Sequence, residues 1–453
     1  MKPYEEYQPT EYDWLPKIPK HWSKRSIRTL TKLSDKRNGN REDLELLSVY
    51  REYGVIRKAS RDDNHNVESL DLSNYKYVGK DYLVMNKMKM WQGSLGVSSY
   101  EGIVSPAYIV CHFSIDANYK YFQFLLRSTT FKTQYNRISY GIRVGQWDMR
   151  YNDFKNINLY IPPRPEQDQI VKFLDFKISK INKFIKDKKR EIELLKEQKQ
   201  AEINRAVTKG LCSNVTMINS GIDWIGEIPM HWAVRRLRTF CDFVNRGSTP
   251  AYTEEKLTKV VNQATFSKGY WDLKNVRYST ADVENNRGLI FHNDILLAST
   301  GGGVLGKSYL FKENDSYIAD SHVTIIRDSK RRFIPEFLYY YLSVSYDLIN
   351  GILSQGSTNQ IELQRNWLRS MFFPYPDINE QKDIALFLMN FENTINTIIQ
   401  SIEIEIVKIQ EYKTSLISEV VTGKVDVRDV KIDEVFEQET LDETEIEEEV
   451  AEE

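Results

Sequence analysis

The sequence predicts an α+β fold built from two copies of one unit, each with a globular α/β domain and one long helix. Three observations lead to this prediction. Two blocks of sequence recur at a nearly fixed spacing, two long stretches carry a heptad pattern, and a β-like run followed by an amphipathic helix occurs once in each half. With 453 residues, the chain is long enough for roughly two to four domains.

The first recurring block is a short stretch that we call the IPxHW motif. Residues 13–29 read DWLPKIPKHWSKRSIRT, and residues 223–239 read DWIGEIPMHWAVRRLRT, at an offset of 210 positions. Two tryptophans and a histidine in the same register indicate a duplication. We expect this motif to pack against the rest of the unit, with Trp and His as anchoring and hydrogen-bonding residues rather than as catalytic groups. The residues concerned are Trp22, Trp232, His21 and His231.

The second recurring block comes where each globular segment ends. PPRPEQDQIVKFL (162–174) matches PYPDINEQKDIALFL (374–388), and an offset of 214 places Glu166-Gln167 on Glu380-Gln381. Each block opens a stretch in which seam positions recur in steps of four and three. The positions are Leu174, Ile178, Ile181, Ile185, Lys188, Ile192, Leu195, Lys199, Glu202 and Ala206 in the first helix, and Leu388, Glu392, Ile395, Ile399, Ile402, Ile406, Ile409, Lys413, Leu416 and Val420 in the second.

A 3.5-residue period held for this length indicates a coiled coil, and the two helices can cover each other's seams. The polar seam residues would fix the register or face a partner subunit. Gly210 and Gly423 are expected to end the helices. The predicted segments are 1–22 (first motif), 23–162 (first domain), 163–210 (first long helix), 211–232 (linker and second motif), 233–376 (second domain), 377–423 (second long helix) and 424–453 (tail).

The two globular segments carry the third signal. YIVCHF (108–113) and YIADSHVTIIR (317–327) have the composition of strands, and amphipathic helices are expected at 119–131 and 335–349. The two domains diverge strongly in sequence, whereas the blocks that flank them agree. This pattern favours a common frame that presents two different recognition surfaces.

Charge is distributed very unevenly along the chain. The net charge is −2, but residues 432–453 hold twelve Asp and Glu and no Lys or Arg, so residues 1–431 carry about +10. A basic body favours a polyanionic partner, and the acidic tail is expected to be disordered and to aid solubility. The three cysteines lie far apart and no stretch is apolar enough to span a membrane, so we expect a metal-free cytoplasmic protein.

The chain resembles the specificity subunit of type I restriction-modification systems over about residues 12–425. The resemblance rests on IPKHW and IPMHW, on LLSVYREYGVIRK (46–58) and DYLVMNKMKMWQGSLGVSSYEGIVSPAY (81–108), and on INLYIPPRPEQ and MFFPYPDINEQ. It implies two target recognition domains separated by two long antiparallel helices, and one half of a bipartite, asymmetric DNA target for each domain. It also implies that two modification subunits supply S-adenosylmethionine binding and adenine methylation, and that restriction subunits use ATP and Mg²⁺. This chain itself would be a non-catalytic subunit without cofactors.

The best candidates for DNA contact lie in the loop before each second block. GIRVGQWDMRYNDF (141–154) corresponds to QGSTNQIELQRNWL (355–368), and the resemblance implies that this loop lies at the DNA. Forked donors and acceptors recognise bases, whereas Lys, Ser and Thr contact phosphates. The candidates are Arg143, Gln146, Ser357, Thr358, Asn359 and Gln360. The alternative is a polar turn without a binding role.

Two further stretches are candidates, each with a structural alternative. NKMKMWQGS (86–94) interleaves Lys87, Lys89 and Trp91, although the same spacing also fits a half-buried strand. NRGSTPAY (245–252) offers Arg246, Ser248 and Thr249 in a turn.

Intrinsic catalysis is not supported by the motifs. The string closest to a methyltransferase N-P-P-[YF] pocket is Ser105-Pro106-Ala107-Tyr108, which lacks the amide and the second proline, and no nuclease carboxylate cluster stands out. A stand-alone DNA-binding or coiled-coil scaffold protein is the alternative function.

GGGVLGKS (301–308) matches the P-loop pattern, but no helical periodicity follows it. Aligning Leu95-Gly96 with Leu305-Gly306, after strands that begin near Asp81 and Asp294, puts Val97 where Lys307 stands. We therefore expect a Gly-rich turn in which Lys307 contacts DNA phosphate, not a nucleotide site.

Overall fold

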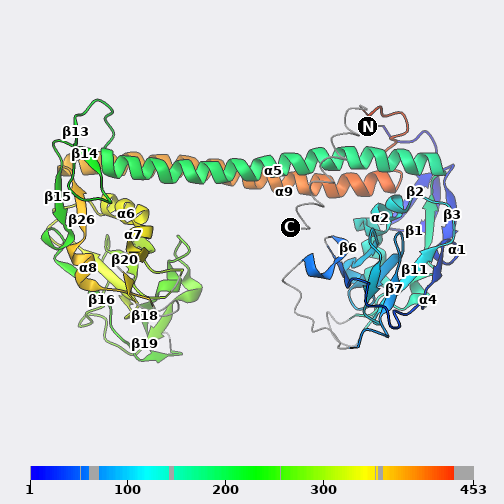
Figure 1. The fold of residues 1–453 in the computed structure, drawn as a ribbon, viewed down its shortest axis with the longest axis horizontal. Helices are drawn as coiled ribbons and strands as arrows, with labels where there is room; N and C mark the ends of the chain where they lie inside the picture. The colour runs from blue at the N-terminus through cyan, green and yellow to red at the C-terminus, as the bar shows by residue number, and fades with distance from the viewer. Residues whose placement is uncertain are drawn as a thin grey trace. The chain divides into compact units, whose positions relative to one another are not determined.

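The computed structural model describes residues 2–51, 53–60, 71–141, 147–255, 257–301, 303–351 and 361–432, together with the backbone of residues 354 and 355. The chain divides into two compact units (Figure 1). Unit 1 consists of Met1–Lys188 and Glu403–Glu453, and unit 2 consists of Lys189–Ile402. Unit 2 is one continuous stretch of chain, whereas unit 1 is assembled from both ends of the sequence.

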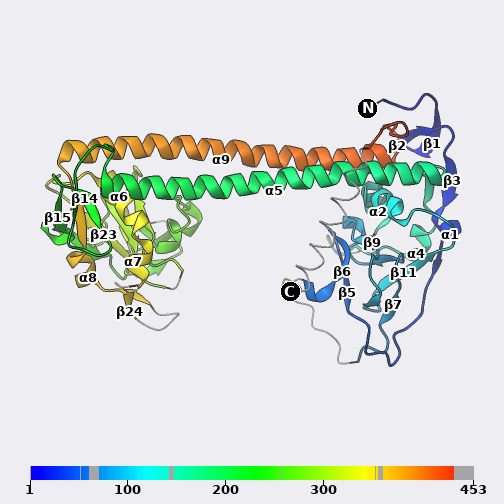
Figure 2. The same ribbon diagram turned by 45° about the horizontal axis from the view of Figure 1, so that its top comes forward.

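Two long helices, α5 (Arg164–Lys209) and α9 (Ile378–Val421), each begin in one unit and end in the other. Within each unit the two helices lie side by side (Figures 1 and 2). In unit 1, Lys188 faces Glu405 at 3.5 Å, and the Lys413 ammonium donates to Asn182 at 2.8 Å. Residue numbers rise on one helix as they fall on the other, so the pairing is antiparallel.

The two long helices also contact each other through polar seam residues in unit 2. Lys199 donates to Glu392 Oε1 at 3.3 Å and to Asn396 Oδ1 at 3.1 Å. Ile192, Ile395 and Ile402 are buried between the helices, which confirms the predicted heptad positions. The polar seam residues Lys188, Lys199, Glu392 and Lys413 therefore find partners on the facing helix, whereas Glu202 pairs with Arg205 of its own helix.

Unit 1 contains the first α/β domain. Its central sheet has the strand order β4-β11-β8-β9, and every neighbouring pair in it is antiparallel. Its strands are β1 (Tyr7–Tyr12), β2 (Leu15–Pro19), β3 (Ser23–Ser26), β4 (Thr31–Leu33), β5 (Leu47–Tyr50), β6 (Gly54–Arg57), β7 (Lys76–Val78), β8 (Leu83–Asn86), β9 (Leu95–Val97), β10 (Gly102–Val104), β11 (Tyr108–Phe113) and β12 (Asn158–Ile161). Its helices are α1 (Ile27–Leu30), α2 (Tyr119–Arg127), α3 (Thr129–Ile138) and α4 (Tyr151–Phe154), with 3₁₀ turns η1 (Lys58–Ser60) and η2 (Met90–Gln92).

Unit 2 contains the second α/β domain, whose central sheet has the order β16-β23-β20-β21. Its strands are β13 (Met217–Asn219), β14 (Glu227–Pro229), β15 (Ala233–Arg236), β16 (Phe243–Arg246), β17 (Tyr252–Thr253), β18 (Thr258–Val261), β19 (Arg277–Ser279), β20 (Ile295–Ala298), β21 (Ser308–Leu310), β22 (Tyr317–Ala319), β23 (Val323–Arg327), β24 (Ser354–Gln355), β25 (Glu362–Leu363) and β26 (Phe372–Tyr375). Its helices are α6 (Pro335–Val344), α7 (Tyr346–Gly351) and α8 (Arg365–Ser370), with 3₁₀ turns η3 (Leu237–Thr239), η4 (Gln263–Thr265) and η5 (Leu273–Asn275).

The two central sheets are equivalent strand by strand. Leu83 of β8 pairs with Cys111 of β11, and Ile295 of β20 pairs with Ile326 of β23. The residue two places before each of these strands, Asp81 or Asn293, has a left-handed backbone, with φ of 65° and 73° respectively. A matching pair of strands, β3-β12 or β15-β26, joins each domain to its long helix. The frame is therefore duplicated in three dimensions.

The regions around the central sheets differ between the units. Unit 2 adds the four-stranded sheet β17-β19-β18-β22, in which β18 and β22 are parallel, over a separate apolar cluster that includes Phe266 and Phe311. Unit 1 has the two-stranded pairs β5-β6 and β7-β10 over a smaller cluster of valines and leucine. One frame thus supports two unlike domains, as the sequence predicted.

The predicted amphipathic helices are each broken once. The stretch 119–131 is α2 followed by the start of α3, because Ser128 has an extended backbone and its side chain caps the amide of Phe131 at 3.5 Å. The stretch 335–349 is similarly divided between α6 and α7. The strand prediction at 108–113 is confirmed by β11, whereas 317–327 forms two strands, β22 and β23.

Candidate nucleic-acid interface

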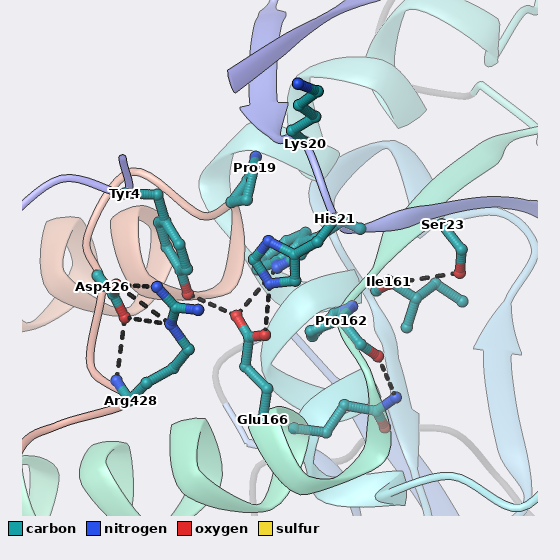
Figure 3. Close-up of polar contacts among 12 residues, drawn as sticks. Tyr4, Pro19, Lys20, His21, Ser23, Ile161, Pro162, Glu166, Asp426 and Arg428 are labelled. Atoms are coloured by element: carbon teal, nitrogen blue, oxygen red, sulfur yellow. Dashed lines mark hydrogen bonds and ion pairs between the residues drawn. The ribbon is translucent and has the colours of Figure 1, made fainter. Parts of the chain in front are cut away.

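The IPxHW motif of unit 1 is bound by the first turn of α5 (Figure 3). The Glu166 carboxylate, buried at 7% exposure, accepts from the Trp22 indole at 3.0 Å and the Tyr4 hydroxyl at 2.7 Å, and it lies 2.7 Å from His21 Nε2. Burial and the neighbouring Glu166 charge raise the pKa of Tyr4 well above its usual range, which keeps that hydroxyl a donor. The predicted packing and hydrogen-bonding roles of Trp22 and His21 are confirmed.

The motif of unit 2 repeats this arrangement with one bond fewer. Glu380 Oε2 accepts from the Trp232 indole at 2.9 Å and lies 3.0 Å from His231 Nε2. No side chain of the described residues takes the place of Tyr4 there, and Glu380 is 26% exposed. We call the two arrangements the glutamate clamps.

The glutamine that follows each clamp glutamate holds the domain to the helix. The side chain of Gln167 donates to the Pro162 carbonyl at 2.9 Å and accepts from the backbone amide of Asn118 at 3.0 Å. Gln381 donates to Pro376 at 2.9 Å and accepts from Ile334 at 2.9 Å. The Glu-Gln pair therefore fixes the motif, the exit strand and the start of the domain's helix at one point.

Each motif also receives the end of the other long helix. Gly423, after α9, has a φ of 71°, and a Cβ atom there would collide with Pro19. Gly210, after α5, has a φ of 75°, and its Cβ would lie 3.2 Å from the Trp232 ring. Only glycine fits a left-handed position packed this closely. The predicted helix stops are confirmed, and the two repeats exchange helix ends.

In unit 2, several loops meet at one end of the central sheet, which we call rim 2. It consists of 245–249, 299–301, 303–307, 322 and 361–365. The Gly301 amide donates to the Ile361 carbonyl at 3.0 Å, and the Leu363 amide donates to the Ser299 carbonyl at 2.9 Å. These bonds join the Gly-rich turn to β25 and its neighbour Ile361, which lie within the predicted recognition loop 355–368.

The Gly-rich turn connects the antiparallel strands β20 and β21 and is followed by a strand. A P-loop instead leads into a helix whose N-terminus holds phosphate. Strand pairing also corrects the alignment within this turn. Leu95 pairs with Met85, and Ser308 pairs with Leu297, so Leu95 is equivalent to Ser308 rather than to Leu305.

The left-handed glycines of the two turns agree with this corrected register. Gly93 (φ 89°) corresponds to Gly306 (φ 88°), and Ser94 corresponds to Lys307. Two shared letters, Leu-Gly, are too short to set a register that strand pairing determines. The phosphate-binding lysine is absent from the first copy in this alignment as well.

Of the candidates in unit 2, Arg246 is the most constrained. Its guanidinium pairs with the Glu362 carboxylate and donates to the Leu363 carbonyl at 3.0 Å. The Ser248 hydroxyl is buried without a hydrogen-bond partner among the described residues, and Thr249 is exposed. Lys307 lies half-buried in the turn. All four of these predicted residues therefore lie in rim 2, with Arg246 on one edge strand of the sheet and Lys307 directly before the opposite edge strand.

Rim 2 contains polar residues that the sequence did not single out. His322 Nδ1 lies 2.8 Å from the Thr300 hydroxyl, and the Arg365 guanidinium donates to Asn245 Oδ1 at 2.8 Å. Arg365 reaches Asn245 across 120 positions of the sequence, because strand pairing brings the two segments together. No local motif marks them.

The equivalent end of the sheet in unit 1, rim 1, consists of 86–94 and 147–150. Lys87 Nζ lies 2.7 Å from Asp148 Oδ2, and the rings of Trp91 and Trp147 lie 5.0 Å apart. Lys89 is exposed beside them. The stretch 86–94 is the end of β8, a turn and η2 rather than a strand, because Gly93 adopts a left-handed backbone.

Six of the candidates fall outside the described residues: Arg143, Gln146, Ser357, Thr358, Asn359 and Gln360. Across the described ranges, no group of three or more His, Cys, Asp or Glu side chains is arranged to hold a metal ion. None of the described helices is long and apolar enough to cross a membrane.

A duplicated frame of clamped motifs and antiparallel helices, carrying two unlike domains, defines a class of internally repeated, two-domain proteins. The family model for the type I restriction modification DNA specificity domain matches this chain twice, at residues 19–194 and 229–408. The chain therefore belongs to the family of type I restriction-modification specificity subunits.

Individual relatives agree with this assignment. The type I restriction enzyme MjaVIII specificity subunit of Methanocaldococcus jannaschii is 26% identical over 376 residues, which cover 78% of this chain and 83% of that protein. The putative MjaX specificity subunit of the same organism is 26% identical over 188 residues, 40% of this chain and 44% of that relative. This second match thus spans less than half of the relative's length.

Solved structures share the fold. A chain from a study of complex assembly and conformational transition in the type I R-M system superimposes with a TM-score of 0.67 at 12% identity, covering 90% of this chain and 99% of that one. The HsdS subunit of Thermoanaerobacter tengcongensis gives a TM-score of 0.55 at 14% identity, covering 92% and 100%. The predicted fold class is confirmed.

Proposed function

We propose that this chain is the DNA-recognition subunit of a type I restriction-modification complex and that it binds a bipartite target, one half-site with each domain. The observation that carries the proposal is the duplicated frame with unlike rims. Rim 1 presents lysines and a tryptophan pair, and rim 2 presents arginines, a histidine and a Gly-rich turn. Unlike rims imply unlike half-sites, in contrast to the palindromes bound by homodimers.

The long helices would set the gap between the half-sites and dock the modification subunits. α5 has 46 residues and α9 has 44, which is roughly 66–69 Å of helix at 1.5 Å per residue. Half-sites one helical turn apart are separated by about 34–36 Å along DNA, which such helices can span. Chemistry would then reside in partner subunits that bind S-adenosylmethionine, ATP and Mg²⁺, in the cytoplasm, with this chain as a non-catalytic subunit.

Deleting matched heptads tests this role. Residues 191–197 of α5 and 396–402 of α9 face each other in unit 2, as the contacts of Lys199 with Asn396 show, and removing both keeps the seam in register. Each helix shortens by about 10 Å. Since base pairs rise about 3.4 Å, we expect the gap to shrink by about three base pairs.

Methyl-adenine mapping of DNA from cells that express the complete system gives both half-sites and the gap directly. The half-site sequences should stay unchanged in the deletion variant, which serves as the internal control. An unchanged gap would contradict the role of the helices, and changed half-sites would contradict the assignment of recognition to the domains.

The alternative is a stand-alone DNA-binding or scaffold protein with the same fold. Titration of the purified chain with the modification subunit separates the two functions. Stoichiometric assembly that gains sequence-specific methylation supports the proposal, and the absence of assembly favours the alternative.

A further inference from the structure

A carboxylate occupies the same place in both rims. In unit 1 the residue is Asp148, and in unit 2 it is Glu362. In unit 1 the next residue, Met149, donates its amide to the carbonyl of Lys87, the first residue after β8, at 3.1 Å. In unit 2 the next residue, Leu363, donates its amide to the carbonyl of Ser299, the first residue after β20, at 2.9 Å. Because β8 and β20 are equivalent strands, this shared backbone bond makes the two acidic residues equivalent.

Each carboxylate binds a cation, but the two cations come from different strands. Lys87 directly follows β8 and lies 2.7 Å from Asp148. Arg246 is the last residue of β16, the equivalent of β4, and pairs with Glu362. A contact inherited unchanged from the duplication would use the same strand twice. The charge neutralisation at this place has therefore been reached by two different routes.

These pairs are not built for stability. The side chains of Asp148 and Glu362 are 38% and 47% exposed, and exposed ion pairs contribute little to folding. The second oxygen of Asp148 is also buried without a hydrogen-bond partner among the described residues, which costs free energy. A negative charge in the same rim as the cations Lys87 and Arg246 further opposes binding to a polyanion.

We propose that Asp148 and Glu362 are specificity-determining carboxylates, each of which neutralises one rim cation and so suppresses sequence-independent attraction to DNA phosphates. The inference rests on the proposed function, because it assigns the rims to DNA. Phosphate contacts supply most non-specific affinity, whereas base contacts supply discrimination. A protein that must find one target among many sites benefits when its non-specific affinity falls and its discrimination between base sequences is unchanged.

The test is the salt dependence of binding by the full-length chain to a duplex without the target sequence. The variants are Asp148→Asn, Glu362→Gln and the double substitution, measured by fluorescence anisotropy over a series of salt concentrations. Each single variant should steepen the slope of log K against log salt by about 0.9, and the double variant by about 1.8. Non-specific affinity should rise roughly eightfold per site near 0.1 M salt.

Two controls remove a carboxylate from an exposed ion pair elsewhere in the same units. Glu6→Gln affects the pair with Lys20, and Asp315→Asn affects the pair with Lys259. Both change the net charge equally and should leave the slope unchanged. Adding Lys87→Gln to Asp148→Asn should restore the wild-type slope, a result that a merely structural pair would not give.

Slopes equal to those of the controls would overturn the inference, as would weaker binding with an unchanged slope, which indicates a structural brace. If the wild-type chain binds DNA but the variants match it, only this inference fails. If the wild-type chain and its complex show no salt-dependent binding to any DNA, the proposed function fails with it.

Discussion

Replacing Glu166 with alanine should destabilise unit 1 more than replacing Glu380 destabilises unit 2. Glu166 is 7% exposed and has three partners, whereas Glu380 is 26% exposed and has two. Breaking a buried charged network costs about 3–5 kcal/mol, because the remaining donors stay buried and unpaired. We therefore expect a loss of about 3–5 kcal/mol for Glu166→Ala. For Glu380→Ala, where water reaches the site, about 1–3 kcal/mol is expected.

Hydrogen exchange under native conditions measures both effects in one molecule. Amides of β12 report on unit 1 and amides of β26 report on unit 2, because each strand pairs with the strand that follows an IPxHW motif. Each variant serves as the control for the other, since the clamps lie in different units. If the two substitutions lowered the free energy of unfolding equally, or if Glu166→Ala lowered it by less than about 1 kcal/mol, the explanation of the clamp would be refuted.

Two further predictions concern single residues. Gly306→Ala should destabilise unit 2 by more than about 1 kcal/mol, because φ is 88° and a Cβ would lie 3.0 Å from the Ile349 side chain. The control Gly351→Ala, which has open space around it, should not lower the stability by this amount. Thermal unfolding of the two variants distinguishes these outcomes. For Glu11, burial raises the pKa, but hydrogen bonds led by that from Tyr160 outweigh it and lower the pKa from 4.5 to about 2. The stability that Glu11 gives over Glu11→Gln should be present above pH 4.5 and lost as the pH falls towards 2, which urea unfolding at several pH values measures; a constant difference would contradict it.

The repeated frame was predictable because its signals are local. The heptad period names the seam residues directly, and the burial of Ile192 and Ile395 confirms it. The IPxHW motifs could be assigned to packing because two tryptophans at one offset mark a common structural need. Gly210 and Gly423 likewise ended the helices where a left-handed residue is required.

The contacts that complete the sites were not predictable in the same way. His21 meets Glu166 across 145 positions, and Arg246 meets Glu362 across 116, so no local pattern links them. The Glu-Gln pairs were visible as a repeat, but their clamp function depends on where the strands bring the motifs. The predicted alignment of the two Gly-rich turns was wrong for the same reason, because the pairing of distant strands sets their register.

The exchange of helix ends has a consequence for synthesis on the ribosome. Domains usually fold in the order in which they emerge, at about 5–20 residues per second. Unit 1 needs residues 403 onward to supply the second half of its helix pair, whereas unit 2 is one continuous stretch. The first domain to leave the ribosome must therefore wait roughly 10–40 seconds for its last helix. During that interval the apolar seam in the first half of α5 has no partner helix and stays exposed on the nascent chain.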